Sequence, residues 1–328
     1  MRRNLLVSFA SAFTLLTVAV SGGSCAVAAE TITMVTTGKG SAQEWPIFIA
    51  EAKGFMAENG VAPDLIAAPS TAAAMQQLAA GSSNLGSGGL TDPLRAIDKG
   101  AQISLLRVEA QVPPYSLWAK PGIKSIADLR GKLIILGGAK DITRIYLERT
   151  LIANGVKPGE YDMIFAGTTA ARFAALSSGA VDAAIMVPPF SFKAKSSGLS
   201  FIANVADYVR DLPFTGYAAN TAWAKLHKAQ LVGFLTGMAK GIDWFYEVAN
   251  RGEAVDILVK ESGSSREDIE ATYDYYKSLH IFDRKGLVEA STVGNLIKAM
   301  QDIGDLEGSL DVNRFIDPEI TSLAAQVK

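Results

Sequence analysis

Residues 71–81 read TAAAMQQLAAG, from Thr71 to Gly81, and residues 169–179 read TAARFAALSSG, from Thr169 to Gly179. The two stretches lie 98 positions apart (169 − 71). Upstream, NGVAP at 59–63 matches NGVKP at 154–158 at an offset of 95, which an indel of three residues explains. Two copies are too few for a solenoid, which needs at least three stacked repeats. The repeat therefore predicts two similar lobes that face each other, with a cleft between them for a small molecule.

Strands and helices are expected to alternate around both copies, a pattern typical of parallel βαβ units. In the first copy the strands are expected at 31–36, 61–67, 85–88 and 103–108, and the helices at 46–58, 71–80 and 92–98. In the second copy the strands are expected at 133–136, 163–165 and 181–187, and the helices at 141–154 and 169–178.

The rest of the chain has a helical pattern, with helices expected at 230–249, 253–261, 266–279 and 287–300. Ser264, followed by Glu267, predicts a capping box at the start of the third of these helices. Pro113-Pro114-Tyr115 and the stretch PFTGY at 213–217 are expected to carry the chain across between the lobes. We therefore predict a first lobe at 30–112 and 217–328, with a helical tail, and a second lobe at 113–216. Two crossing segments make a hinge.

The first 29 residues have the pattern of a cleaved export signal. Two arginines are followed by an apolar run and by Ala26-Val27-Ala28, a small-residue cleavage site. The apolar run is too short and too often interrupted by Ser and Thr for a membrane anchor. Cys25 is the only cysteine, and the residues before it match a lipid-attachment motif poorly, so we expect cleavage without lipidation. The sequence leaves general secretion and twin-arginine export as alternatives.

The composition restricts the kind of partner. The net charge is −2, and basic and acidic residues are interspersed, which argues against nucleic acid and against a polybasic membrane contact. If Cys25 is removed with the signal, the mature chain has no disulfide and no thiol nucleophile. After the signal, no run of 18 apolar residues follows, so we expect no membrane insertion of the mature chain.

The loops after the predicted strands are candidates for a ligand site. In open parallel sheets, ligands bind beyond the carboxyl ends of the strands, where helix N-termini offer free N–H groups to anions. Ser70 and Thr71 open one helix, and Thr169 opens its counterpart. Each hydroxyl either caps its own helix or contacts a ligand. Lys140 and Asp141 open another helix, and there Asp141 either lies at the site or pairs with Arg144 on the helix surface.

Aromatic side chains at loops and crossings have two interpretations as well. Trp45, Tyr115, Phe190 and Phe214 form either a wall for a ligand or part of the core. The loop around Thr91 and Asp92 diverges from its counterpart around Pro188, as expected where a ligand sets the residues. Thr215 lies in the second crossing and joins the candidates.

Signals for catalysis are weak. The two histidines, His227 and His280, lie in the helical tail with no cysteine or carboxylate at metal-ligand spacing, so we expect no metal. Neither a G-x-S-x-G elbow nor a dinucleotide-binding or P-loop pattern occurs, and we expect no cofactor. Asp92 and Glu44 are a possible carboxylate pair, but capping and solvent exposure are simpler explanations.

The chain resembles the periplasmic solute-binding proteins of ABC importers, in the SsuA/TauA-like branch that includes alkanesulfonate, taurine, nitrate and thiamine-precursor binders. The resemblance covers nearly the whole mature chain. It rests on FIAEAKGF at 48–55, QLAAG at 77–81 and IADLRGK at 126–132, together with the opening at 31–45 and the second repeat at 175–185. The cysteine-rich iron motif of the eukaryotic pyrimidine-forming relatives is absent, which argues against their enzymatic activity.

This resemblance implies an α/β, two-lobed type II periplasmic-binding-protein fold. Each lobe is then a mixed, mostly parallel sheet flanked by helices, and the first lobe carries the tail. It also implies a periplasmic monomer whose partners are a small ligand, a permease and its ATPase. Together with the residues considered above, it gives a predicted ligand-binding set of Gln43, Trp45, Ser70, Thr71, Thr91, Asp92, Tyr115, Lys140, Asp141, Thr169, Pro188, Phe190 and Thr215.

Three functions are considered for a chain with these sequence features. The leading one is capture of a small organic anion, such as a sulfonate, a carboxylate or a related aromatic or heterocyclic compound, and its delivery to an ABC permease without chemistry. The second is a ligand sensor of the same fold that presents its closed state to a receptor. The third, an exported hydrolase or lyase, lacks a recognisable nucleophile or metal constellation.

Overall fold

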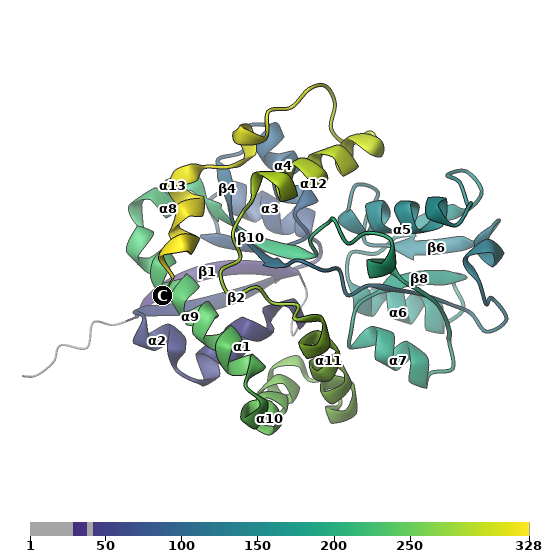
Figure 1. Ribbon diagram of the computed structural model, residues 1–328, viewed down its shortest axis with the longest axis horizontal. Helices are drawn as coiled ribbons and strands as arrows, with labels where there is room; N and C mark the ends of the chain where they lie inside the picture. The colour runs from purple at the N-terminus through teal and green to yellow at the C-terminus, as the bar shows by residue number, and fades with distance from the viewer. Residues whose placement is uncertain (1–28, 38–41, 328) are drawn as a thin grey trace, which may run out of the picture.

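A computed structural model describes residues 29–37 and 42–327 of the 328 in the chain. The predicted export signal, including Cys25, lies outside the described residues apart from its last position, and so do residues 38–41. Figure 1 shows two lobes side by side, with the C-terminal helices packed on the larger one.

The first lobe is built on a five-stranded sheet in the order β2-β1-β3-β10-β4. The strands β1, β2 and β3 are parallel, whereas β10 runs antiparallel to both of its neighbours. The strands are β1 (Glu30–Thr37), β2 (Val61–Ala68), β3 (Leu85–Gly88), β4 (Ile103–Ala110) and β10 (Thr215–Asn220). The helices between them are α1 (Trp45–Ala52), α2 (Phe55–Glu58), α3 (Thr71–Ala79) and α4 (Thr91–Asp98).

The second lobe repeats this plan with the order β7-β6-β8-β5-β9. Here β6 is parallel to β7 and β8, and β5 is antiparallel to β8 and β9. The strands are β5 (Ser116–Ala119), β6 (Leu133–Leu136), β7 (Asp162–Phe165), β8 (Ala183–Met186) and β9 (Ser200–Asn204). The helices are α5 (Ile142–Ala153), α6 (Thr169–Ser177) and α7 (Phe190–Ser196).

The predicted duplication is visible in the fold. The order of the two sheets corresponds strand by strand, with β1, β2 and β3 taking the places of β6, β7 and β8. Gly81 and Gly179 end equivalent helices with φ angles of 75° and 78°. This left-handed conformation favours glycine, which explains why the residue recurs at the repeat distance. The two-lobed α/β fold is confirmed, whereas the antiparallel strands β5, β9 and β10 were not predicted.

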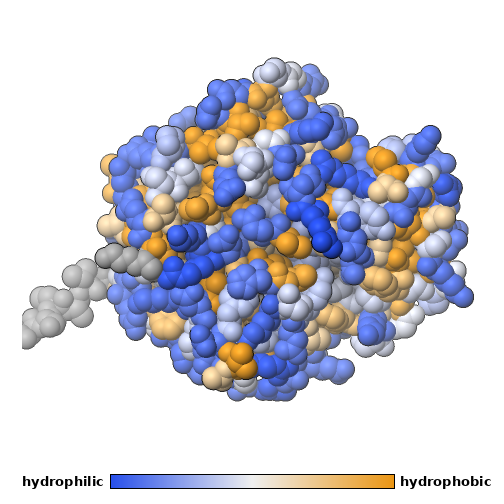
Figure 2. All heavy atoms as spheres, in the orientation of Figure 1, coloured by the Kyte–Doolittle hydropathy of each residue, from blue (hydrophilic) through white to orange (hydrophobic). Residues whose placement is uncertain are grey.

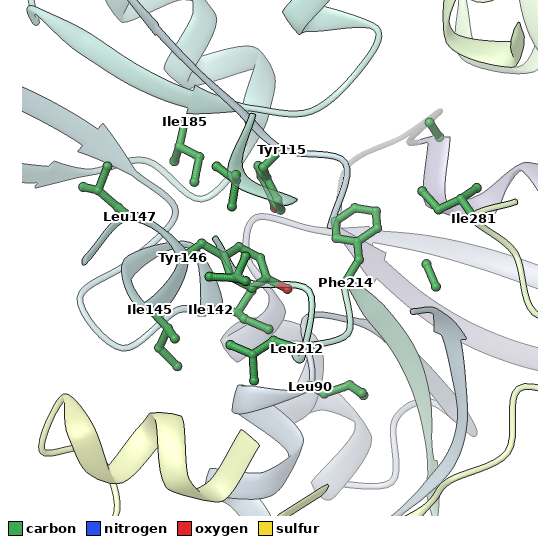
Figure 3. Close-up of a cluster of buried hydrophobic side chains, with 14 of the residues drawn as sticks. Leu90, Tyr115, Ile142, Ile145, Tyr146, Leu147, Ile185, Leu212, Phe214 and Ile281 are labelled. Atoms are coloured by element: carbon green, nitrogen blue, oxygen red, sulfur yellow. The ribbon is translucent and has the colours of Figure 1, made fainter. Parts of the chain in front are cut away.

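Two segments join the lobes, from β4 to β5 and from β9 to β10. Aromatic rings pack where they meet: Tyr115 lies 5.5 Å from the ring of Tyr146 and 5.4 Å, edge to face, from that of Phe214. Figure 3 shows these three side chains turned toward one another, with Ile142 and Leu212 beside them. A single buried cluster therefore continues from one lobe into the other. Each of the two sheets forms the centre of one lobe. The lobe boundaries at 112/113 and 216/217, which were proposed from the sequence, remain a prediction.

The C-terminal tail is helical and packs mainly on the first lobe, where α9 lies along α1. Its helices are α8 (Thr221–Leu226), α9 (Lys228–Tyr246), α10 (Arg251–Ser262), α11 (Arg266–Leu279), α12 (Ala290–Asp302) and α13 (Pro318–Thr321). The predicted cap of α11 was wrong by one residue, because Ser265 accepts the N–H of Asp268 in place of the pair Ser264 and Glu267.

Short 3₁₀ turns complete the fold at 42–44, 126–129, 205–207, 248–250, 312–315 and 322–326. On the face in view, Figure 2 shows hydrophilic residues spread widely, with hydrophobic ones in small groups between them. Within the described ranges, no helix combines the length and the hydrophobicity that crossing a membrane requires.

Candidate functional site

A pocket of about 160 Å³ lies between the two lobes, beyond the carboxyl ends of their parallel strands. Both lobes, both crossing segments and the loop before α11 contribute to it. Its lining residues are Thr37, Ala42, Gln43, Thr71, Gly89, Tyr115, Asp141, Ile142, Gly167, Thr168, Thr169, Ala170, Arg172, Val187, Pro188, Pro189, Phe190, Phe214, Thr215, Ser262 and Ser264. The topology thus gathers loops that are far apart in the sequence around one small volume.

Eight of the thirteen predicted ligand-binding residues line this pocket. They are Gln43, Thr71, Tyr115, Asp141, Thr169, Pro188, Phe190 and Thr215. The structure does not bring the other five to its surface, namely Trp45, Ser70, Thr91, Asp92 and Lys140. The roles of the eight in binding remain a prediction. Of the other five, Thr91 is the first residue of α4 and is fully buried there, which keeps it from the pocket surface. The remaining four have the positions described next.

Trp45 lies in the core instead of the cleft. It is the first residue of α1 and is fully buried. Its ring packs 6.4 Å from that of Phe245 and 5.5 Å from that of Tyr276, both in the helical tail. The tail therefore removes the indole from the ligand wall that the sequence suggested.

Two neighbouring hydroxyl residues lie at the N-terminus of each repeated helix, and the two have different roles. Ser70 and Thr168 are the N-caps, and their side-chain oxygens accept the N–H groups of Ala73 and Ala171 at 3.2 Å. Thr71 and Thr169 come one residue later and line the pocket from opposite lobes. The caps thus fix the helix ends, and the neighbouring threonines are left at the cleft.

Asp141 caps α5 and lines the pocket at the same time. Its Oδ1 accepts the backbone N–H of Thr143 at 2.9 Å and the hydroxyl of the same residue at 2.5 Å. The alternative surface pair with Arg144 does not form, since Arg144 donates to Glu148 at 2.7 Å and to the carbonyl of Ala139. Two donors and a helix N-terminus therefore balance the negative charge of Asp141.

Asp92 and Lys140 belong to an ion cluster between the lobes, beside the pocket. Arg95 on α4 contacts Asp92 and Asp305 at 2.5 Å, and it also donates to the carbonyl of Lys140. The Lys140 ammonium lies 3.0 Å from Asp305. The carboxyl of Asp305 comes from the tail and is 1% exposed. The cluster thus links α4 and the tail of the first lobe to the start of α5 in the second.

Burial and charge act on the acids of this cluster in different ways. Burial raises the pKa of Asp92 to about 6, and the carboxylate of Asp141 adds to this against the attraction of Arg95. For Asp305 burial acts in the same raising direction, but hydrogen bonds from Arg95 and Lys140 outweigh it and lower the pKa. Asp305 is therefore the firmly charged partner of the two cations.

Arg172 is a pocket residue that the sequence reasoning missed. It lies on α6 and is 2% exposed, and its guanidinium donates to the carbonyl of Ile185 at 2.9 Å and to the hydroxyl of Thr169 at 2.8 Å. Longer hydrogen bonds reach the carbonyls of Ala166 and Gly167. The repeat in the sequence could have revealed Arg172, because its counterpart at the 98-residue offset is an alanine, Ala74. In the structure Ala74 is fully buried.

The charge of Arg172 has no acidic partner within ion-pairing distance among residues 29–37 and 42–327. Its neighbours are carbonyl and hydroxyl oxygens, which accept four hydrogen bonds from its five N–H groups but carry no negative charge. It is also the one basic side chain among the described residues that line the pocket. A buried charge without a counter-charge is costly, so an anion that enters the pocket gains a strong partner.

Tyr115 lies beside this cation. Burial raises its pKa to about 12, although Arg172 acts in the opposite direction, so the phenol is neutral at ordinary pH and can donate a hydrogen bond. Ser262 and Ser264, which precede α11, add hydroxyls from the tail and were not predicted. Within the part of the chain that the structure describes, no group of three potential metal-ligating side chains occurs.

Comparison with known proteins identifies the family. The family description "NMT1/THI5 like" matches residues 41–250, well over half of the chain. The chain belongs to the NMT1/THI5-like family. This result confirms the resemblance to the SsuA branch of solute-binding proteins that the sequence motifs indicated. A search of curated proteins finds no match.

Three solved structures illustrate the shared fold of this NMT1/THI5-like protein. The ligand-binding component of an ABC-type import system from Staphylococcus aureus has 14% identity and a TM-score of 0.75, over 90% of this chain and 99% of that one. The nitrate-binding protein NrtA from Synechocystis PCC 6803 has 15% identity and a TM-score of 0.75, over 90% and 88%. The alkanesulfonate-binding protein SsuA from Xanthomonas axonopodis pv. citri, bound to MOPS, has 17% identity and a TM-score of 0.68, over 90% and 99%. At these identities the likeness shows the fold.

Proposed function

We propose that this chain is the extracytoplasmic solute-binding component of an ABC transporter. In this proposal it captures a small organic anion in the interlobe pocket and delivers it to a permease, without chemistry. The observation that carries it is Arg172, a buried guanidinium at the pocket with no acidic partner among the described residues. The family and the fold support a solute-binding role, and the neighbours with that fold include ABC import proteins.

The proposed ligand lies between the two repeated helix N-termini. Thr71 and Thr169 face it from opposite lobes, Arg172 and Tyr115 offer donors to its anionic group, and Phe190 and Phe214 offer an apolar wall. Because the pocket draws on both lobes, a ligand that contacts both favours the arrangement in which they meet. Closure of the lobes about the two crossing segments then follows from the differential affinity of the ligand.

A thermal-shift panel with matched anionic and neutral compounds tests the proposal. Pairs such as benzoate and benzamide, or methanesulfonate and dimethyl sulfone, have similar shapes and differ in charge. A ligand at 100 times its dissociation constant adds about 2.7 kcal/mol, which raises the midpoint by about 4 °C in a protein of this size. We expect shifts from one class of anions and none from their neutral partners. Equal shifts from both members of a pair would contradict anion capture.

Transport requires a second measurement, uptake of the identified anion by cells with and without the gene. We expect uptake to fall in the deletion strain and to return with the wild-type gene. Unchanged uptake in the deletion strain, with binding confirmed in vitro, would favour the sensing role.

The Lys140 ion pair predicts a small effect of salt on binding. Lys140 is 55% exposed in its side chain and pairs across the cleft with Asp305. Since partly exposed pairs contribute about 0.2–1 kcal/mol, Lys140→Gln is expected to weaken binding up to about fivefold. Calorimetric titration at low and high salt checks this, because the difference between variant and wild type should shrink as salt screens the pair.

The control for this change is Lys157→Gln, which removes an exposed lysine of the same lobe that makes no ion pair with the described residues. Both substitutions change the net charge equally. If Lys157→Gln weakens binding as much as Lys140→Gln does, the effect comes from overall charge and the interlobe pair contributes nothing.

A further inference from the structure

A second cavity, of about 410 Å³, lies where the second lobe meets α11 of the tail. It shares no lining residue with the interlobe pocket. Strands β5 and β9 and helix α7 form most of it, and α11 of the tail closes one side. The lining residues are Pro114, Ser116, Trp118, Ser191, Phe192, Lys195, Leu199, Phe201, Asn204 and Tyr275.

Aromatic rings dominate the walls of this cavity. Trp118 and Phe201 are cross-strand partners on β5 and β9, and their rings meet edge to face at 5.4 Å. On the other side, Phe192 of α7 and Tyr275 of α11 meet edge to face at 5.9 Å. Four rings from four elements thus surround a space wide enough for a flat ring system.

Phe201 is the exposed part of the aromatic lining and is accessible to a ligand. Its side chain is 49% exposed, although its partner Trp118 is only 5% exposed. An exposed phenylalanine beside a cavity gains free energy when an apolar ligand covers it, in proportion to the area that the ligand removes from water. A single exposed apolar residue needs no explanation, but one that forms the rim of an aromatic cavity does.

Lys195 gives the described lining of this cavity a positive charge. Lys195 on α7 is exposed at the rim and makes no ion pair with the described residues. The other polar lining side chains, Ser116, Ser191, Asn204 and Tyr275, are uncharged at neutral pH, and no acidic residue within the described ranges lines the cavity. By contrast, Lys193 on the same helix lies over the ring of Phe173, 5.4 Å from its centroid, and is not a lining residue.

We propose that this cavity is a second ligand site, which binds an aromatic acid. The flat ring of the ligand packs between the Trp118–Phe201 and Phe192–Tyr275 pairs, and its carboxylate or sulfonate contacts the Lys195 ammonium. The proposed site is separate from the interlobe pocket, because the two have no lining residue in common.

The probe for the test is 2-naphthalenesulfonate, with 2-naphthyl methyl sulfone as its neutral counterpart. Calorimetric titration measures the affinity and the number of sites. We expect Phe201→Ser to weaken binding of the sulfonate about three- to tenfold, because only the exposed half of the ring is left for the ligand to cover. We expect Lys195→Gln to weaken it about two- to fivefold and to leave binding of the sulfone unchanged. Both residues are exposed. Because Phe201→Ser also removes the ring contact with the buried Trp118, circular dichroism must show that this variant is folded.

Two matched variants locate the binding event. Lys193→Gln removes the neighbouring lysine and should leave the affinity unchanged, and Arg172→Gln should leave it unchanged as well, since it alters only the interlobe pocket. Absence of binding to the wild type, equal losses in Lys193→Gln and Lys195→Gln, or full affinity in Phe201→Ser would each overturn the second site. Loss in Arg172→Gln alone would place the probe in the interlobe pocket, which also overturns the second site while supporting the first.

Discussion

Replacing Arg172 with glutamine is expected to weaken binding of the anionic ligand by about 30-fold or more. Removing one partner of a buried, hydrogen-bonded charge pair costs about 2–5 kcal/mol, and each 1.4 kcal/mol is a factor of ten. Arg172 is 2% exposed and lines the pocket, so its interaction with an anion is shielded from water. Titration of wild type and variant with the strongest anion from the thermal-shift panel measures the loss.

Two further variants separate the charge of Arg172 from its geometry. Arg172→Lys keeps a positive charge but loses the planar fork that two-point recognition needs, so we expect an intermediate affinity. Thr169→Ala removes the hydroxyl that accepts the Nη2 hydrogen bond at 2.8 Å, and we expect a loss of about 1 kcal/mol through poorer positioning of the guanidinium.

The control is Arg144→Gln, in the same lobe. Arg144 pairs with Glu148 and does not line the pocket, so this change should leave affinity near the wild-type value. Circular dichroism and a denaturant titration of each variant show that the protein is folded. Full affinity in a folded Arg172→Gln protein would exclude the guanidinium as the anion partner, and the proposed class of ligand would then be wrong.

The part of the site that local sequence rules describe was predictable. Helix N-termini carry hydroxyl and carboxyl caps for reasons of backbone chemistry, and so Thr71, Asp141 and Thr169 could be placed near one edge of each sheet. The repeat then brought the two edges together, because equivalent loops of two similar lobes meet in the cleft. This step needed only the capping pattern of each helix and the repeat in the sequence.

Two of the wrongly placed residues, Trp45 and Lys140, depend on contacts with the helical tail. Trp45 is buried by Phe245 and Tyr276, and Lys140 is drawn away by Asp305, and all three partners lie in the tail. A sequence pattern does not show which distant helix will cover a side chain. Arg172 is different, since comparing the repeats would have shown an arginine at the place of a buried alanine.

Replacing Gly167 with alanine is expected to hold the two lobes apart. A Cβ atom at Gly167, in the second lobe, would lie 2.4 Å from the carbonyl oxygen of Pro69 and 3.2 Å from the Cβ of Ser70, in the first lobe. The first distance is far shorter than any real contact, and the atom it meets belongs to the backbone and cannot rotate away. Relief requires the loop or the whole lobe to move, which opens the pocket between them.

The expected consequence is a loss of affinity of about tenfold or more. The substitution shifts the equilibrium toward separated lobes, and the ligand binds the arrangement in which the lobes meet. Small-angle X-ray scattering with saturating ligand should show a larger radius of gyration for Gly167→Ala than for wild type. The stability of the ligand-free protein should change little, because the clash lies between the lobes and not within either core.

Gly252→Ala is the matched control for the same chemical change. Gly252 lies on α10, and a Cβ there would meet no atom within 4 Å, so the alanine should leave affinity unchanged. It should also stabilise the protein by about 0.4–1 kcal/mol, because alanine has fewer conformations than glycine in the unfolded chain. If Gly167→Ala binds the ligand as tightly as Gly252→Ala does, the contact between residues 69–70 and Gly167 is not required for binding. Tight binding would then have to arise from one lobe alone, and the joint role of Thr71 and Thr169 would be withdrawn with it.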